Sequence, residues 1–343
     1  MFNFFKEKKV LFLTFLILAL GLIFILTKSD EVIEIKNQSA DAVDEINNNT
    51  SPLSGLICDN YNRRPIAVVL ANDPVARPLS GLSQADLVFE IPVITGSITR
   101  LIAVYICNHP EEIGSLRSAR HDFIPLVQGI DAILAHWGGS HFALDKLNNG
   151  IMDNIDAMIN LHNAFYRKNE IPLPHNGFTS IENLLNSAQK YGYRLDNKFE
   201  GYLFQKENQK SKNSKKLIIG YSYPYNVSYQ YDPETNSYLR YRTNSKEIDK
   251  INENQIKAKN IVVMRVFSKQ IEEPDYNDLN LEGTGECQVY QNGIIIDCIW
   301  QKSEKDPYSK LKFLNKETNQ EIPFVAGQTW IELVEPYQKV TWE

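Results

Sequence analysis

The N-terminus holds the feature that most constrains this chain, an unbroken run of eighteen uncharged and mostly apolar residues at positions 10–27, VLFLTFLILALGLIFILT. As an α-helix this run is about 27 Å long, close to the hydrocarbon thickness of a bilayer. Lys6, Lys8 and Lys9 precede it, and a basic flank predicts that this end is cytoplasmic. We therefore expect a single-pass membrane anchor over residues 1–28, with the folded body outside the cell membrane.

A cleaved signal peptide is the alternative interpretation, because signal peptides share the basic start and the apolar run. The run is longer than the roughly 7–15 residues usual in a signal peptide, and no clear A-x-A cleavage site follows it. We therefore expect the helix to stay attached. Residues 29–54 are rich in Asp, Glu, Asn and Ser, which is typical of a polar tether without a core of its own.

The chain as a whole has the composition of a globular protein. Of its 343 residues 43% are hydrophobic and 23% are charged, and its formal net charge is −6. A mildly acidic chain lacks the basic face that nucleic acid requires, so we expect no nucleic-acid partner. We expect two domains, 55–204 and 217–343, joined by residues 205–216, which contain five lysines and no apolar residue. The alternative for this segment is contact with an anionic surface.

The first domain mixes strands and helices. Short runs rich in β-branched residues predict strands at 66–71, 86–91, 98–107 and 132–136. Ser118 is the expected N-cap of a helix that ends at Gln128, and a short helix is expected between Ser140 and Gly150. Thr179, with Glu182 three residues later, predicts a further capped helix. This order implies at least one crossover connection.

The second domain is expected to be mainly β. Strands are predicted at 260–266 and 327–334. Seven tyrosines lie around the Asp232-Pro233 turn, and we favour cross-strand packing over a sugar-binding platform. They are Tyr221, Tyr223, Tyr225, Tyr229, Tyr231, Tyr238 and Tyr241.

Four cysteines fit an exported protein. Asn292-Gly293 is a strong two-residue hairpin turn, and a turn centred there places Cys287 directly opposite Cys298. Paired residues across a hairpin lie within disulfide reach, so we predict that bond. Cys58 and Cys107 remain as a second pair without local support. The alternative for both pairs is buried free thiols.

Candidate ligand-binding residues gather in the first domain, where all six histidines occur between His109 and His175. His136 ends a strand and leads into a glycine turn, where backbone amides and a helix start favour an anion. Arginines near the start of the earlier helix oppose its dipole, which calls for an anionic ligand or a buried carboxylate such as Glu90. The predicted ligand-binding residues are Arg100, Arg117, Ser118, Arg120, His136, Gly138, Gly139, Ser140, His175 and Asn176.

Known catalytic and cofactor patterns are absent. The chain contains no G-x-S-x-G, H-E-x-x-H, Walker or G-x-G-x-x-G sequence, and its histidines show no zinc-ligand spacing. We therefore predict neither a cofactor nor a metal. If the protein is an enzyme, His136 and His175 are the candidate general bases.

A series of ordered motifs runs across residues 55–336. They are RPIAV (64–68), ARPLSGLSQAD (76–86), ITR (98–100), IGSLRSAR (113–120), HWGGS (136–140), PHN (174–176), NIVV (260–263), GTG (283–285), WQK (300–302) and GQTWI (327–331). In these motifs the chain resembles the YerB-like family of bacterial envelope lipoproteins, a two-part domain of unknown function. The resemblance implies an extracytoplasmic location and a layered α/β N-terminal part with a mixed sheet, followed by a mainly β part; it implies no activity.

One departure from that family concerns the anchor. The first cysteine is Cys58, far beyond the apolar run, so we expect the helix to replace a lipid attached to a signal-peptide cysteine. Three functions remain open: binding of an anionic cell-envelope polymer, hydrolysis or transfer on such a polymer, and a non-catalytic scaffold for envelope membrane proteins. We favour the first, because suitable polar residues are visible and a catalytic arrangement is not.

Overall fold

A computed structural model of the protein describes residues 49–205, 210–273 and 276–343. The predicted anchor and nearly all of the tether lie outside the described residues. Within the described ranges no helix is both long and apolar enough to cross a bilayer. These residues belong to one compact unit.

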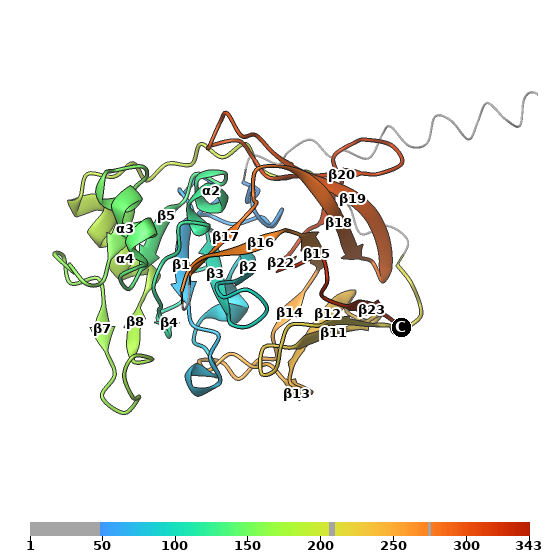
Figure 1. The fold of residues 1–343 in the computed structure, drawn as a ribbon, viewed down its shortest axis with the longest axis horizontal. Coiled ribbons are helices and arrows are strands. Elements are labelled where there is room, and N and C mark those ends of the chain that lie inside the picture. The colour runs from blue at the N-terminus through green and yellow to red at the C-terminus, as the bar shows by residue number, and fades with distance from the viewer. Residues whose placement is uncertain (1–48, 206–209, 274–275) are drawn as a thin grey trace, which may run out of the picture. The chain divides into compact units, whose positions relative to one another are not determined.

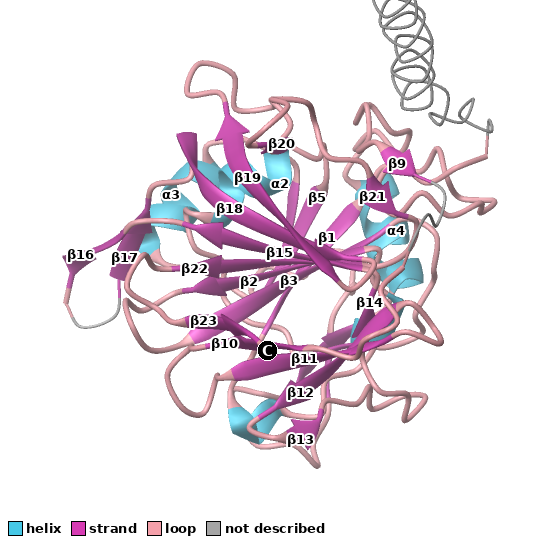
Figure 2. Ribbon diagram, turned by 90° about the vertical axis from the view of Figure 1, so that its right-hand side faces the viewer, coloured by secondary structure: helices cyan, strands magenta, loops and turns pink. Residues whose placement is uncertain are grey.

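A ten-stranded sheet forms the centre of that unit (Figures 1 and 2). Its strands, in spatial order, are β20 (Lys312–Asn315), β19 (Ile294–Lys302), β18 (Gly283–Gln291), β15 (Asn260–Arg265), β22 (Thr329–Val334), β2 (Leu87–Pro92), β3 (Thr99–Tyr105), β1 (Ile66–Leu70), β5 (Ile133–His136) and β6 (Asn154–Asp156). Five of these strands come from each predicted domain, so both predicted domains contribute to one sheet. The domain boundary at residues 205–216 stays a prediction.

The sheet is mixed, as predicted. β1, β5 and β6 are parallel to one another, as are β15, β22 and β2, whereas β3 is antiparallel to both its neighbours. β1 reads IAVVL with every side chain buried, the pattern expected of a strand covered on both faces. β5, α3 (His141–Asn148) and β6 form the predicted crossover.

A second, antiparallel sheet packs against one face of the first. It contains β13 (Ser245–Lys246), β12 (Ser237–Arg242), β11 (Val227–Asp232), β10 (Lys216–Ile219), β23 (Val340–Trp342) and β14 (Lys257–Ala258). Three smaller pairings join β16 (Ser268–Glu272) to β17 (Tyr276–Leu279), β9 (Phe204–Gln205) to β21 (Phe324–Val325), and β8 (Gly177–Thr179) to β4 (Ile113–Gly114) and β7 (Tyr166–Arg167).

Two apolar cores lie on opposite faces of the central sheet. One contains Val69, Phe89 and residues of α2 (Phe123–Gln128). The other contains Val68, Val88 and the inner side chains of the second sheet. Alternate residues of one strand serve the two cores because strand side chains alternate between faces.

Tyrosines fill much of the second core. Tyr229, Tyr231 and Tyr238 are fully buried, and Tyr231 stands opposite Tyr238 with ring centroids 5.0 Å apart. Tyr223 is instead 84% exposed. The buried set supports the cross-strand packing that we favoured.

Two predicted helix starts are wrong. Ser118 does not cap α2, which begins after Asp122, because the preceding backbone pairs with strand neighbours instead: the Arg117 amide donates to Val69 O. The third helix, α4 (Ile181–Lys190), is capped by the Ser180 hydroxyl, which accepts from the Asn183 amide, whereas Thr179 ends β8. The short helix α3 begins after Ser140 as predicted, and the structure adds that the Ser140 hydroxyl caps it. Single 3-10 turns occur at Pro74–Ala76 and Leu82–Gln84.

Both predicted disulfides are present, Cys287–Cys298 and Cys58–Cys107. Cys287 stands opposite Cys298 in the β18–β19 ladder, which turns at Asn292-Gly293. Both turn residues have positive φ, 54° and 71°, the conformation that a two-residue type I′ hairpin turn requires. Local turn chemistry therefore determines the position of this bond.

We expect loss of the Cys58–Cys107 bond to destabilise the protein more than loss of Cys287–Cys298. Cys58 and Cys107 are 49 residues apart in the sequence, whereas Cys287 and Cys298 are 11 residues apart, so the first bond closes the longer loop. Loop-closure entropy predicts costs of about 4 and about 3 kcal/mol. Urea unfolding of the two double Cys→Ala variants measures the difference, and an equal or reversed order contradicts the entropic account.

Candidate functional site

The predicted arginines gather beside the carboxyl ends of the parallel strands β1, β5 and β6. β3 runs antiparallel to β1, so Arg100, near the start of β3, lies at the same end of the sheet. In open α/β sheets, ligands bind beyond the carboxyl ends of parallel strands. The geometry therefore places the cationic residues where this class of fold most often carries a site.

Residues 116–120 cross this end of the sheet in an extended conformation. The Arg117 amide donates to Val69 O (2.9 Å), and Arg117 O accepts from the Trp137 amide (3.1 Å). The Ala119 amide donates to Gly138 O (2.9 Å). These bonds hold Arg117 between the ends of β1 and β5, in a fixed position relative to the sheet.

Arg100, Arg117 and Arg120 form a cationic cluster. Arg100 is 8% exposed, and its Nη1 donates to Ser118 O at 2.6 Å. The pKa of Arg100 lies well below its usual range, because the guanidinium is buried and because Arg120 and Arg117 repel its charge. In the described part of the chain no carboxylate lies within 4.0 Å of the Arg100 guanidinium. Buried charges are normally paired, so this guanidinium lacks the counter-ion that burial calls for.

Asp73 is a carboxylate that lies beside Arg117. Its Oδ2 lies 3.7 Å from Arg117 Nε, and its Oδ1 accepts from the Tyr225 hydroxyl at 3.0 Å. Burial, with Asp73 beside it, raises the pKa of Tyr225 to about 12. Sequence reasoning missed both residues. The position of Asp73, just after the predicted strand 66–71, could have indicated a site residue. No sequence pattern distinguished Tyr225 from the other tyrosines.

His175 lies beside Asp73, next to the cluster. Its Nδ1 lies 4.0 Å from Asp73 Oδ2 and has no hydrogen-bond partner among the described residues. Burial and the charge of Arg117 lower the pKa of His175. A neutral imidazole with an unused nitrogen is able to accept a proton.

His136 has a different environment. It is fully buried, its Nδ1 lies 2.8 Å from Gly138 O, and its Nε2 lies 3.1 Å from Asn154 Oδ1. Both ring nitrogens are thus engaged within the protein. This geometry favours a structural role, and a catalytic His136 remains only a prediction.

The glycine turn after His136 uses its polar groups internally. The Gly138 amide donates to Asp156 Oδ1 (2.8 Å), and Gly138 has a φ of 62°. The Ser140 amide donates to Ala119 O, and the Ser140 hydroxyl caps α3. These contacts build the β5–α3 connection, so ligand binding by Gly138, Gly139 and Ser140 stays a prediction.

Asn176 positions a further cation that the sequence did not indicate. Its Oδ1 accepts from Arg167 Nη1 at 2.5 Å, and the Arg167 guanidinium lies 4.2 Å from the centre of the Trp137 ring. Arg167 is exposed. The contact of Asn176 therefore extends the cationic surface indirectly, through Arg167.

A buried ionic network lies between the two sheets, and sequence reasoning found only its Glu90. Arg240 is fully buried and pairs with Glu90, with Glu247 (2.8 Å) and with Glu332 (2.5 Å). Arg242 pairs with Glu90 at 2.7 Å. Expected compensation of the site arginines by Glu90 is therefore wrong, because Glu90 is paired with Arg240 and Arg242.

This network holds three carboxyls and two guanidiniums. The pKa of Glu90 is lowered by Arg242 and Arg240 against the effect of burial, and these arginines lower the pKa of Glu247 to about 2. Burial raises the pKa of Glu332 to about 7, although Arg240 opposes the shift. The raised pKa means that Glu332 keeps its proton to a higher pH than Glu90 or Glu247.

We expect the stabilising effect of Glu332 relative to a Glu332→Gln variant to decrease as the pH rises from 5 to 8. The folded-state pKa of about 7 lies above the ordinary glutamate pKa of 4.5. Between these values the folded state retains a proton that the unfolded state loses, so this contribution is present at low pH and lost through pH 7. The expected change is about 2 kcal/mol.

Urea unfolding of both proteins at pH 5, 6, 7 and 8 measures this effect. Parallel pH profiles for wild type and Glu332→Gln are incompatible with a raised pKa at Glu332.

Three surface hollows in the described part of the chain lie apart from the arginine cluster. Their volumes are about 260, 650 and 210 Å³, and none of them is lined by any of the ten predicted ligand-binding residues. Charge and burial are the features that identify the cluster.

Comparison with known proteins gives the family. Residues 53–194 match the domain described as "Protein of unknown function (DUF3048) N-terminal domain", and residues 217–331 match its C-terminal domain. The chain is 32% identical over 304 residues to YerB, a candidate lipoprotein of Bacillus subtilis (strain 168), covering 87% of this chain and 90% of that protein. It is also similar to the crystal structure of YerB from Bacillus subtilis, with a TM-score of 0.76, 30% identity, and coverage of 85% of this chain and 99% of that one. The chain therefore belongs to the YerB-like family, whose two domains of unknown function together form the shared sheet described above.

Proposed function

We propose that the protein is held at the outer face of the cell membrane and binds an anionic group of a cell-envelope polymer at the cluster of Arg100, Arg117 and Arg120. One observation carries this proposal. The Arg100 guanidinium is buried beside two further arginines, and no carboxylate of the described residues lies within 4.0 Å of the Arg100 guanidinium itself. An anionic ligand supplies the missing counter-ion.

The cluster suits phosphate or carboxylate. Guanidinium groups donate paired N–H bonds to the oxygens of either group, and such charge-assisted bonds are about twice as strong as neutral ones. The described environment of the cluster contains Asp73, which orients Arg117 and Tyr225. Arg100 and Arg117 together outweigh this one carboxylate, which leaves positive charge for the ligand.

The proposed location rests on two observations. The related YerB of Bacillus subtilis is described as a candidate lipoprotein, and this chain carries the apolar run at 10–27. Because the first cysteine is Cys58 and it forms a disulfide with Cys107, we propose that the apolar helix anchors this chain in place of a lipid.

A hydrolase or transferase acting on the same polymer is the second candidate function. It is favoured by His175, whose Nδ1 has no hydrogen-bond partner among the described residues and lies 4.0 Å from Asp73 Oδ2. In such an enzyme His175 accepts a proton from the attacking water or hydroxyl, and the arginines stabilise the developing charge.

The test is anion binding by full-length protein in a non-ionic detergent. A glycerol phosphate oligomer and a polyglutamate of equal charge serve as probes, and calorimetry and mass spectrometry follow binding and product together. Arg100→Met removes the proposed site, and Lys246→Met, at an exposed residue of β13, changes the net charge equally. Binding lost only in Arg100→Met supports the proposal. Equal binding by all proteins, or by none, contradicts it, and new product masses favour the enzyme.

A further inference from the structure

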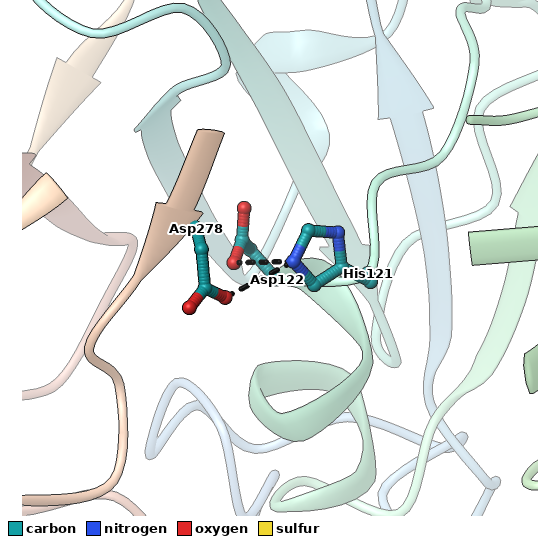
Figure 3. Close-up of side chains that lie close together, drawn as sticks. All are labelled: His121, Asp122 and Asp278. Carbon is teal, nitrogen blue, oxygen red and sulfur yellow. Dashed lines mark hydrogen bonds and ion pairs between the residues drawn. The ribbon is translucent and has the colours of Figure 1, made fainter. Parts of the chain in front are cut away.

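A second chemically distinctive group lies at the start of α2, apart from the contacts described above. His121 and Asp122 precede Phe123, the first residue of α2, and Asp278 faces them from β17 of the outlying β16–β17 hairpin (Figure 3). Sequence analysis predicted no metal site, because Asp278 lies 157 residues beyond His121. Only the fold brings these three side chains together.

The two distances from His121 in this group match those between ligands of one metal ion. His121 Nε2 lies 3.1 Å from Asp278 Oδ1 and 3.5 Å from Asp122 Oδ1, and the three ligand atoms all lie within 4.8 Å of one another. Nitrogen and oxygen ligands that sit about 2.0–2.2 Å from a common metal are themselves roughly 3–3.5 Å apart. The three side chains therefore converge on one point (Figure 3).

Asp122 supplies an independent observation. Its side chain is only 3% exposed, and its Oδ2 is buried without a hydrogen-bond partner among the described residues. Asp122 stands at the N-cap of α2, yet its carboxylate makes no capping bond; its Oδ1 instead accepts from the Leu279 amide at 3.0 Å. The oxygen that faces His121 is Oδ1, so Oδ2 itself does not point into the group. With one of its two oxygens lacking a donor, this buried carboxylate has little to stabilise its negative charge, and a buried charge is costly unless a cation compensates it.

We propose that His121, Asp122 and Asp278 bind a divalent transition metal ion, Zn²⁺ or Mn²⁺, which fastens the β16–β17 hairpin to the start of α2. One imidazole nitrogen and two carboxylate oxygens suit these ions, whereas Mg²⁺ and Ca²⁺ prefer oxygen alone. Three protein ligands leave at least one position open for water or for an anion.

The proposed metal site adjoins the proposed anion-binding cluster, but the two proposals do not depend on each other. Arg120, one residue before His121, lies 5.4 Å from the centre of the Tyr276 ring, two residues before Asp278. A metal that fixes the hairpin therefore also fixes a neighbour of Arg120. Loss of metal binding and loss of polymer binding are measured separately, so failure of one proposal does not decide the other.

The expected affinity is moderate. His121 Nδ1 is buried without a hydrogen-bond partner among the described residues, whereas metal-bound histidines usually donate this second N–H to an acceptor, and loss of that acceptor weakens binding by about 10–100-fold. Asp278 is also 59% exposed. We expect dissociation constants on the order of micromolar.

The same hairpin provides a matched control. His141 Nε2 lies 3.2 Å from Glu272 Oε2, with both side chains about half exposed. This pair resembles His121–Asp278 in chemistry, but among the described residues no buried third carboxylate joins it. It therefore separates a built three-ligand site from ordinary binding of metal to a surface histidine beside a carboxylate.

The test uses full-length protein without a histidine tag, stripped with a chelator, and titrated with ZnCl₂ or MnCl₂ alone. Calorimetry gives the stoichiometry, and the midpoint of thermal unfolding gives a second readout. We expect one saturable site in wild type, at least 30-fold weaker binding in Asp278→Asn and His121→Gln, and no change in Glu272→Gln. Asp278→Asn alters an exposed side chain, so it retains the fold.

Each other outcome overturns the proposal. Wild-type protein without a saturable site shows that His121 and Asp278 form only an ion pair. Equal binding by Asp278→Asn places the metal elsewhere, and equal loss in Glu272→Gln shows diffuse binding by surface histidines. Hydrogen exchange of residues 268–273 and 276–279 provides a further readout, because a bound metal must slow their exchange.

Discussion

Replacing Arg100 with methionine is expected to weaken binding of the anionic polymer about 100-fold and to leave the protein at least as stable as wild type. A bidentate bond from a guanidinium to an anion contributes about 3 kcal/mol, and each 1.4 kcal/mol is about a tenfold change in affinity. The loss of affinity therefore follows directly from the loss of the buried cation.

The stability of this variant separates a binding role from a structural one. Arg100 is buried beside Arg117 and Arg120, its one observed hydrogen bond is to Ser118 O, and its pKa is well below the usual range. A charged form that is disfavoured in the folded state destabilises that state. Methionine keeps the aliphatic length and removes the charge, so we expect the free energy of unfolding to rise by about 1 kcal/mol.

Urea unfolding and calorimetric titration of the same samples measure both effects. Lys246→Met, on the exposed β13, is expected to change neither quantity by more than about 0.5 kcal/mol. If Arg100→Met instead loses stability while retaining affinity, Arg100 is a structural residue and the anion-binding proposal fails.

Replacing Arg240 with methionine is expected to destabilise the protein by about 3–5 kcal/mol, because it leaves buried carboxylates without their cation. Arg240 is fully buried. It pairs with Glu90, Glu247 and Glu332, and its guanidinium lies 3.6 Å from the centre of the Trp330 ring. No other arginine contact in the network compensates Glu332 among the described ion pairs.

The cost of Arg240→Met is expected to increase with pH. Burial already raises the pKa of Glu332 to about 7, and removal of Arg240 raises it further. A proton taken up by Glu332 relieves part of the cost below that pKa and is lost above it. Unfolding experiments at pH 6 and pH 8 therefore give a smaller and a larger destabilisation.

Two further variants control this prediction. Arg265 lies at the end of β15 and donates to the backbone carbonyls of Glu335 and Gln338, so Arg265→Met breaks hydrogen bonds without stranding a carboxylate. It is expected to cost about 1–2 kcal/mol. The double variant Arg240→Met/Glu332→Leu is expected to recover part of the loss. An Arg240→Met cost no larger than that of Arg265→Met contradicts the role given to the network.

Features set by neighbouring residues were predictable from the sequence. The Asn292-Gly293 turn determined the register that places Cys287 opposite Cys298. The β-branched run of β1 identified a buried strand, and Ser140 identified the start of α3. In each case the deciding interaction spans only a few residues, so it is written in consecutive positions of the chain.

Local signals failed where a distant segment competes for the same groups. Ser118 has the side chain of a helix cap, but the amides on either side of it donate to Val69 and Gly138, whose strands lie elsewhere in the sequence. Glu90 was a reasonable partner for the site arginines until Arg240 and Arg242, about 150 residues away, were found to pair with it.

The sequence by itself determined the family, most strands of the central sheet, apart from β6 and β20, and the Cys287–Cys298 pair, which left Cys58 and Cys107 as the second pair. The tertiary structure alone decided which of the predicted arginines lies without a carboxylate, that His136 is engaged and His175 is not, and that Asp278 meets His121 and Asp122. The physical reason is that the protonation, pairing and burial of a side chain depend on its neighbours in space. In a sheet assembled from strands up to 240 residues apart, such as β2 and β22, most of those neighbours are distant in the chain.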